Sequence, residues 1–124
     1  MNIKEEIRKV LLKKKNEIFL NVLDKNINIS YIDFYKNSSR VLNYFKKQKI
    51  NPGSKITVQM DNSIEFLYVI FACLLGNYIV CPLDTEINKE KLKKIENILN
   101  PSKKIKNKNH LKYSKNNFKI NIKE

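Results

Sequence analysis

The stretch from Pro52 to Asp84, PGSKITVQMDNSIEFLYVIFACLLGNYIVCPLD, contains both glycines and both cysteines of the 124-residue chain. Two short apolar segments within it, Lys55–Met60 and Tyr78–Cys81, have the character of strands and are bounded by turn signals. Between them nearly every residue from Ile64 to Leu75 is apolar, which predicts a helix that protein covers on all sides. A strand, a helix and a second strand predict a βαβ unit with parallel strands and a right-handed crossover.

The ends of this helix carry local signals. Asp61, Asn62 and Ser63 are N-cap candidates, and Glu65 stands three residues after Asn62, as in a capping box. Gly76-Asn77 fits a left-handed stop at the other end.

Upstream of this unit the pattern predicts two helices and a hairpin. Residues 1–15 form an amphipathic helix whose apolar stripe is Ile3, Ile7, Val10 and Leu11, and we expect it to dock on the parent domain rather than on a membrane. Glu17–Leu23 and Ile27–Ile29 flank a turn at residues 24–26. Ser30-x-x-Asp33 then begins a helix that ends near Lys46–Lys49. Its predicted inner face is Phe34, Tyr35, Ser38, Val41, Leu42 and Phe45.

Downstream of it, residues 88–99 predict another amphipathic helix, which Asn100-Pro101 stops. Its predicted inward residues are Leu92, Ile95, Ile98 and Leu99. We expect residues 1–100 to form the structured part and residues 101–124 to be a basic, weakly structured tail. The tail is either a weak edge strand followed by a solvated basic end, or an out-of-frame relic.

The segment KITVQMDNSIEFLYVIFACLLGNYIVCPLD resembles the early part of the AMP-forming, adenylate-forming ligases, which include acyl-CoA synthetases, amino-acid adenylation domains and luciferases. The shared order is an apolar strand, an Asn-Ser-x-Glu-Phe helix start, a helix ending in Gly, and a strand into Pro-Leu-Asp. The resemblance extends upstream through Ser30-Tyr31 and residues 39–42, and downstream through residues 92–99. It implies an α/β fold, namely the N-terminal βαβ portion of the ligase large domain, with an incomplete parallel sheet flanked by helices.

The resemblance also implies a chemistry for the full-length enzyme. Such an enzyme activates a carboxylic or amino acid with ATP and Mg²⁺ to an acyl-adenylate, then transfers it to the thiol of CoA or of a carrier protein. The family's Ser/Thr/Gly-rich loop with Lys has no counterpart here, and Gly53 and Gly76 are explained as a turn and a helix end. We therefore expect a truncated N-terminal segment that supplies scaffold, with no catalytic, cofactor-binding or metal-binding residue of its own and no activity alone.

The residues that could carry chemistry have simpler explanations. His110 is the sole histidine and lies among Lys and Asn, which predicts a solvated loop residue. Cys73 and Cys81 lack metal-site spacing and are expected to be reduced core thiols in a cytoplasmic protein. The acidic residues nearest the core take turn or helix-start positions; they are Asp61, Glu65 and Asp84.

A formal net charge of +13 raises two further hypotheses. A small basic module could bind nucleic acid or an acidic partner, but arginine occurs only at Arg8 and Arg40, which argues against nucleic acid. A non-catalytic subunit could instead pair with the remainder of a split ligase, or self-associate through exposed apolar surface. The run Phe66–Leu83 is too short and too interrupted to be a membrane span.

Overall fold

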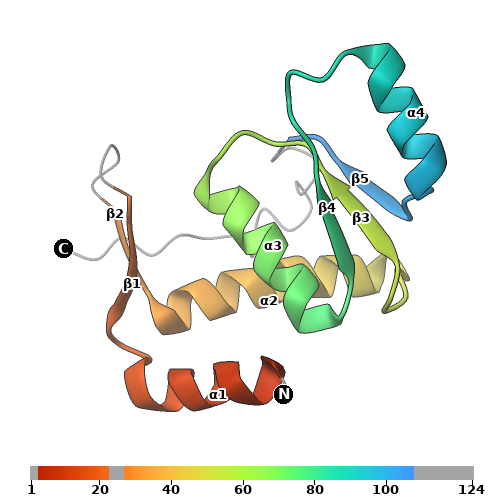
Figure 1. Cartoon of the computed structure of the whole chain (residues 1–124). Coiled ribbons are helices and arrows are strands. Elements are labelled where there is room, and N and C mark those ends of the chain that lie inside the picture. Colours follow the sequence, from red (N-terminus) through yellow and green to blue (C-terminus); the bar gives the residue numbers. More distant parts are fainter. Residues whose placement is uncertain (1–2, 23–26, 108–124) are drawn as a thin grey trace.

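The computed structural model describes residues 3–22 and 27–107, and within them the chain forms four helices and five strands (Figure 1). In chain order these elements are α1 (Ile3–Lys14), β1 (Ile18–Val22), β2 (Ile27–Ser30), α2 (Tyr31–Lys47), β3 (Lys55–Val58), α3 (Ile64–Gly76), β4 (Ile79–Pro82), α4 (Lys89–Leu99) and β5 (Lys103–Ile105).

A three-stranded parallel sheet with the order β4-β3-β5 organises the fold. Lys55 of β3 is opposite Ile79 of β4, and Ile56 is opposite Lys103 of β5. The crossover through α3 leads from β3 to β4, and the one through α4 leads back past β3 to β5. Crossovers between parallel strands are right-handed, and these two crossovers run in opposite directions across the sheet. Helices α3 and α4 therefore lie on opposite faces of the sheet, as Figure 1 shows. The predicted βαβ unit and α/β fold class are confirmed.

Strand β5 is the edge strand that was one of the two alternatives for the chain after Pro101. The backbone N–H of Ser102 donates to Lys55 O (2.8 Å), and that of Gln59 donates to Ile105 O (2.7 Å). The Ile105 side chain is fully buried. Residues 103–105 therefore belong to the sheet, while the rest of the expected tail from residue 108 lies outside the described residues.

The predicted hairpin and the start of α2 are also confirmed. Strands β1 and β2 pair antiparallel, with a register shift between Ile18 and Leu20. Ser30 Oγ accepts a hydrogen bond from the backbone N–H of Asp33 (3.2 Å), so it is the N-cap of α2. The residues that α2 buries are Asp33, Phe34, Asn37, Ser38, Val41, Leu42, Tyr44 and Phe45, and Tyr35 of the predicted face is half-buried.

The two ends of α3 compare differently with the sequence pattern. Its N-cap is Ser63, one of the three predicted candidates, whose Oγ accepts from the backbone N–H of Phe66 (3.2 Å). The capping box predicted between Asn62 and Glu65 is therefore wrong. At the other end Asn77 takes the left-handed conformation (φ 59°) and is the predicted stop. Gly76 is helical, and it is required because a Cβ there would lie 2.5 Å from the Tyr78 ring and 2.6 Å from Leu42 Cδ1.

The prediction that protein covers α3 on all sides is wrong. Leu67 is 38% exposed and Leu74 is 40% exposed. The reason is geometric, because α1, α2 and the sheet pack against only part of the helix surface and leave Leu67 and Leu74 exposed. The side chains that α3 does bury are Ile64, Tyr68, Val69, Ala72, Cys73 and Leu75.

The outer helices dock less deeply than their patterns indicate. In α4 the predicted inward residue Ile98 is 81% exposed, and Leu92, Ile95 and Leu99 are only half-buried. In α1 the side chain of Ile7 packs against the core, whereas Ile3 and Val10 remain exposed. Helix α1 lies against α2 and α3, as expected for a docked helix (Figure 1).

Candidate functional site

The first place to look for a ligand site is the carboxyl edge of the parallel sheet. In open α/β sheets ligands bind outside the carboxyl ends of the strands, where the crossovers change direction. In this chain that point lies between β3 and β5. The residues that follow these two strands are Gln59 and Lys106.

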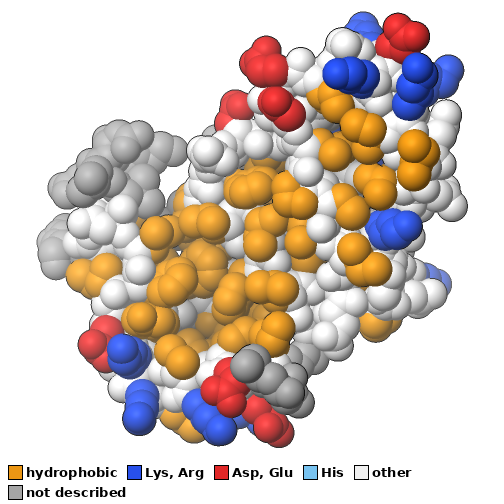
Figure 2. All heavy atoms as spheres, viewed as in Figure 1, with side chains coloured by type: hydrophobic (Ala, Val, Ile, Leu, Met, Phe, Trp, Pro, Cys, Tyr) orange, Lys and Arg blue, Asp and Glu red, His pale blue; other side chains and the backbone are white. Residues whose placement is uncertain are grey.

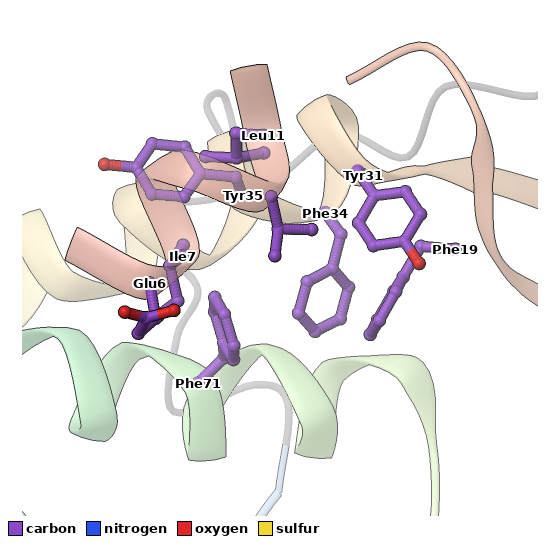
Figure 3. Close-up of a pocket in the computed structure, with 9 residues that line it drawn as sticks. Glu6, Ile7, Leu11, Phe19, Tyr31, Phe34, Tyr35 and Phe71 are labelled. Carbon is purple, nitrogen blue, oxygen red and sulfur yellow. The ribbon is translucent and has the colours of Figure 1, made fainter. Parts of the chain in front are cut away.

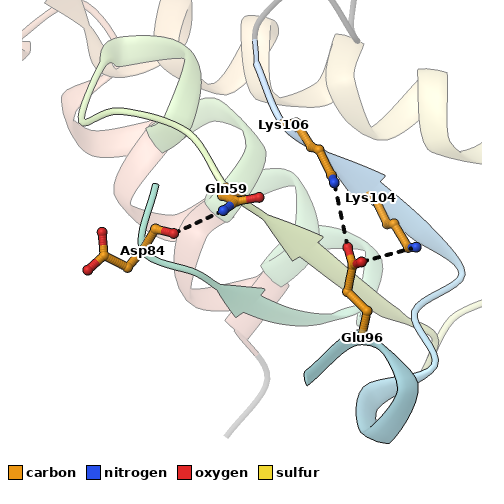
Figure 4. A network of polar contacts seen from close by, with 5 residues as sticks. All are labelled: Gln59, Asp84, Glu96, Lys104 and Lys106. Atoms are coloured by element: carbon orange, nitrogen blue, oxygen red, sulfur yellow. Dashed lines mark hydrogen bonds and ion pairs between the residues drawn. The ribbon is translucent and has the colours of Figure 1, made fainter. Parts of the chain in front are cut away.

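The backbone donors at this edge are engaged by the chain itself. The N–H of Gln59 donates to Ile105 O (2.7 Å), and the N–H of Leu83 donates to Val58 O (2.9 Å). The side chain of Gln59 donates from Nε2 to Asp84 O (3.0 Å), which ties the ends of β3 and β4 together (Figure 4). Asp84 Oδ1 accepts from the backbone N–H of Glu86 (2.9 Å), which is a local turn. These groups therefore stabilise the loops and are not free for an anion.

The described residues do not fit an ATP–Mg²⁺ site. A phosphate cradle needs glycines that let backbone N–H groups approach the anion. Gly53 serves a turn (φ 86°), and Gly76 ends α3. Across residues 3–22 and 27–107 no group of three or more His, Cys, Asp or Glu could hold a metal ion.

A cluster of charges beside the sheet edge has a structural role. The carboxylate of Glu96 in α4 lies 3.4 Å from Lys104 Nζ and 3.8 Å from Lys106 Nζ (Figure 4). Glu96 is only 14% exposed, while both lysines reach solvent. These pairs attach α4 to the end of β5 and contribute on the order of 1 kcal/mol.

The residues singled out in the sequence do not come together in one site. Asp61 is exposed in the loop before α3, and Glu65 lies in the first turn of α3. Both cysteines are free thiols; Cys73 is buried as expected, and burial raises its pKa to about 12. Cys81 is only half-buried. His110 lies outside the described residues.

A buried polar contact that the sequence pattern missed joins α2 to α3. Asn37 Nδ2 donates to the Tyr68 hydroxyl (3.0 Å), and Arg40 donates to Asn37 Oδ1 (2.9 Å). Burial is the main reason that the pKa of Tyr68 rises to about 12. The contact positions one helix against the other, and only the presence of Asn37 within an apolar face could have indicated it.

The candidate functional site is an apolar surface, which we name the α3/β4 face. It consists of exposed Leu67, Leu74 and Ile79 together with half-buried Phe66, Ile70 and Val80. Figure 2 shows hydrophobic side chains in a continuous band over α3 and β4, with most of the charged side chains in view near the top and bottom of the molecule. Exposed apolar patches of this kind mark interaction sites.

An aromatic cavity of about 240 Å³ extends the apolar surface towards α1. Figure 3 shows Phe34 from α2 and Phe71 from α3 pointing into one space, with Ile7 of α1 opposite. The ring centroids of Phe34 and Phe71 are 5.1 Å apart, and those of Phe34 and Phe19 are 4.8 Å apart. The packed aromatic rings therefore form one wall of the cavity, and α1 forms the opposite wall.

Comparison with protein families gives one match, to the AMP-binding enzyme model over residues 8–113. The chain belongs to the AMP-binding enzyme family. The resemblance stated from the sequence is thereby confirmed. A comparison with curated protein sequences gave no match.

Solved structures with the same fold are adenylate-forming ligases, as expected for an AMP-binding enzyme. The Klebsiella oxytoca NpsA N-terminal subdomain, in complex with 3-hydroxyanthranilyl-AMSN, matches with a TM-score of 0.75 at 9% identity, over 86% of this chain and 27% of that one. O-succinylbenzoate coenzyme A synthetase (MenE) from Bacillus subtilis, in complex with AMP, matches with a TM-score of 0.67 at 17% identity, over 75% and 24%. The artificial Klebsiella oxytoca fusion NpsA-ThdA, an adenylation-PCP di-domain, matches with a TM-score of 0.72 at 8% identity, over 84% and 19%.

These matches define how much of the family fold the chain contains. The chain spans about a quarter of the length of the solved structures it matches. At these identities the likeness shows the fold, which is that of the N-terminal domains of adenylate-forming ligases. No helix within residues 3–22 and 27–107 is long and apolar enough to cross a membrane.

Proposed function

We propose that this chain is the N-terminal scaffold of an AMP-forming ligase. The whole enzyme would activate a carboxylic or amino acid with ATP and Mg²⁺ to an acyl-adenylate and pass the acyl group to a thiol. The family match over residues 8–113 supports this proposal. The thiol would belong to CoA or to a carrier protein; one structural relative is a CoA synthetase, and another is fused to a PCP.

The α3/β4 face is the observation that carries the proposal. It exposes Leu67, Leu74 and Ile79 on α3 and on β4, which is the outermost strand of the described sheet. Apolar side chains in a continuous area favour contact with protein, because each square ångström removed from water contributes about 25 cal/mol. The chain matches 27% of the NpsA subdomain, so a larger body of protein accompanies this fold in that relative. We infer that the face packs against the remainder of the ligase, in the same polypeptide or in a second chain.

The contribution of this chain to such an enzyme would be structural. Its own residues would hold α2 and α3 in register through Asn37 and Tyr68 and would attach α4 to the sheet through Glu96. ATP and Mg²⁺ would bind to other parts of the enzyme. The cytoplasm is the compartment that we propose, because Cys73 and Cys81 are both free thiols.

ATP–pyrophosphate exchange with a mixture of carboxylic and amino acids tests the proposal. The purified 124-residue chain should give no exchange above buffer, because its described residues offer no phosphate cradle. Coexpression with the product of the adjoining downstream DNA should yield a complex that catalyses exchange. Exchange by the isolated chain, or a downstream product without a Ser/Thr/Gly-rich loop and Lys, would refute the scaffold role.

A further inference from the structure

A second hollow lies on the opposite side of α1 from the aromatic cavity, between α1 and α2. Its volume is about 440 Å³. It is lined by Arg8, Leu11, Leu12, Lys15, Ile32, Tyr35, Ser39, Leu42, Lys46 and Leu75, and we name it the α1/α2 groove. None of its lining residues is acidic.

Backbone contacts fix how the two helices form this groove. The N–H of Ile32 donates to Lys15 O (3.0 Å), and the N–H of Tyr31 donates to Glu17 O (3.0 Å). These bonds hold the end of α1 next to the start of α2, so the helices run antiparallel side by side (Figure 1). From Ile32 to Lys46 the helical rise gives the groove a length of about 21 Å.

The groove combines a cationic rim with an apolar floor. Its three charged residues are Arg8, Lys15 and Lys46, all of them exposed. In the part of the chain that the structure describes, the ion pairs found join other residues. The floor is formed by Leu11, Leu42 and Leu75, of which the last two are largely buried.

The aromatic cavity next to it has the opposite character. Leu11 and Tyr35 line both hollows and form the wall between them. The one charged residue that lines the aromatic cavity is Glu6, which would repel an anion. The α1/α2 groove and the aromatic cavity therefore differ in the sign of their charge, and the cavity can serve as an internal control for anion binding.

We propose that the α1/α2 groove binds a free single-chain amphiphile with a carboxylate or phosphate head. The guanidinium of Arg8 can bind either head in a bidentate manner, with Lys15 as the second cation. Two of the three cations, Arg8 and Lys15, come from α1 and the residue that follows it, whereas Lys46 alone lies at the C-terminal end of α2, so the head is assigned to the Arg8–Lys15 pair. The tail lies along the leucine floor. This site is separate from the sheet edge and does not depend on the proposed ligase scaffold.

Titration calorimetry of the full chain with decanoate and decyl phosphate, each below its micelle concentration, tests the proposal. Both anions should bind with one ligand per chain, and neutral 1-decanol should not bind measurably. Raising the ionic strength to about 1 M, where the Debye length is about 3 Å, should weaken binding strongly. Equal binding of the alcohol, or binding that survives high salt, would mean that the cations do not hold the head and would overturn the proposal.

Variants locate the ligand within the molecule. The double variant Arg8→Gln/Lys15→Gln should weaken binding by about tenfold or more, because it removes two charge-assisted hydrogen-bond donors. Lys13→Gln removes one charge from the last turn of the same helix without lining the groove and should leave the affinity within about twofold. Leu12→Glu places an anion in the groove at a position that is 78% exposed, so it should abolish binding without unfolding the protein.

Two further outcomes would contradict the assignment. Val10→Phe fills part of the aromatic cavity, and a loss of decanoate binding in this variant would move the ligand there. Binding to phosphatidylglycerol vesicles in the absence of binding to monomeric decanoate would make α1 a membrane-surface helix and not one wall of a ligand site. Circular dichroism of every variant confirms that a lost signal reflects the site and not the fold.

Discussion

Helices α3 and α4 are both crossover helices of the parallel sheet, but their surfaces differ in polarity. Helix α3 is almost wholly apolar, and it buries its inner side chains against α2 and the sheet. Helix α4 carries five charged residues among its first six and has no buried residue. It is attached by half-buried Leu92, Ile95 and Leu99 and by the carboxylate of Glu96.

This difference is the basis of our proposal that the α4 side of the sheet faces solvent and the α3 side faces further protein. A helix whose outer side faces solvent needs polar residues on that side, and α4 has them. Helix α3 has apolar residues on its inner and outer sides alike, and Leu67 and Leu74 reach the surface. The excess of apolar residues over what this chain covers is the physical basis for assigning the α3/β4 face to a protein interface.

The largest expected difference between the helices is in the cost of shortening a side chain. Leu75→Ala in α3 should lower the free energy of unfolding by about 3 kcal/mol, because it empties a buried site. Ile98→Ala in α4 should change it by less than about 0.5 kcal/mol, because the side chain is 81% exposed. Urea denaturation of both variants measures the difference, and equal losses would show that α4 is packed as deeply as α3.

The next effect on stability is expected from the close packing at the C-terminal end of α3. Gly76→Ala should cost about 2 kcal/mol, because its Cβ would lie 2.5 Å from the Tyr78 ring and force the contact apart. Gly53→Ala is the control, because a Cβ added at Gly53 would meet no other atom within 4 Å apart from its chain neighbours. Only the positive φ of Gly53 adds a cost, of about 1 kcal/mol. Thermal unfolding compares the two, and the reverse order would mean that Gly76 is not confined by its neighbours.

Removing the N-caps should affect the helices on different scales. Ser63→Ala should lower global stability by about 1 kcal/mol, while Asn62→Ala should be nearly neutral because Ser63 is the cap. Asn88→Ala removes the acceptor of the Lys91 N–H (2.8 Å) and should mainly speed hydrogen exchange within α4, which has no buried residue. Amide exchange read residue by residue separates local fraying from global opening. A larger global loss for Asn62→Ala than for Ser63→Ala would restore the capping box at Asn62.

Titration provides a further effect, which concerns buried groups of α3 and grows as the pH rises. Burial raises the pKa of Cys73 from 9.0 to about 12 and that of Tyr68 from 10.0 to about 12. In the unfolded chain these groups lose protons first, so their contribution to stability is complete below pH 9 and falls as pH rises from 9 towards 12. Urea midpoints between about pH 8 and about pH 10.5 should decline in the wild type and decline less in Cys73→Ala. An identical decline in both proteins would remove Cys73 as a cause.

The features that the sequence predicted well are those set by local chemistry. The hairpin, the Ser30 cap, the left-handed stop at Asn77 and the order of the βαβ unit depend on neighbouring residues. The N-cap of α3 was predicted only as one of the three cap-forming residues at 61–63, and the capping box favoured Asn62. Only the backbone geometry selects Ser63.

Burial was harder to predict because it depends on distant segments. An apolar helix pattern predicted full coverage of α3, but coverage also requires other elements on every side, and the described chain provides too few. Ile98 fits the apolar stripe of α4, yet the described chain leaves it 81% exposed. The α1/α2 groove could not be predicted, since it exists only because residues 15–17 bring α1 alongside α2.

The most direct test of the central claim is whether the α3/β4 face is open to a partner in solution. Binding of the dye ANS, followed together with sedimentation velocity, reports exposed apolar surface and self-association. The isolated chain should bind the dye or self-associate, and Leu67→Lys/Leu74→Lys should abolish both while Ile98→Lys on α4 leaves them unchanged. A monomeric wild-type chain that binds no dye and unfolds cooperatively would contradict the claim that this face awaits more protein.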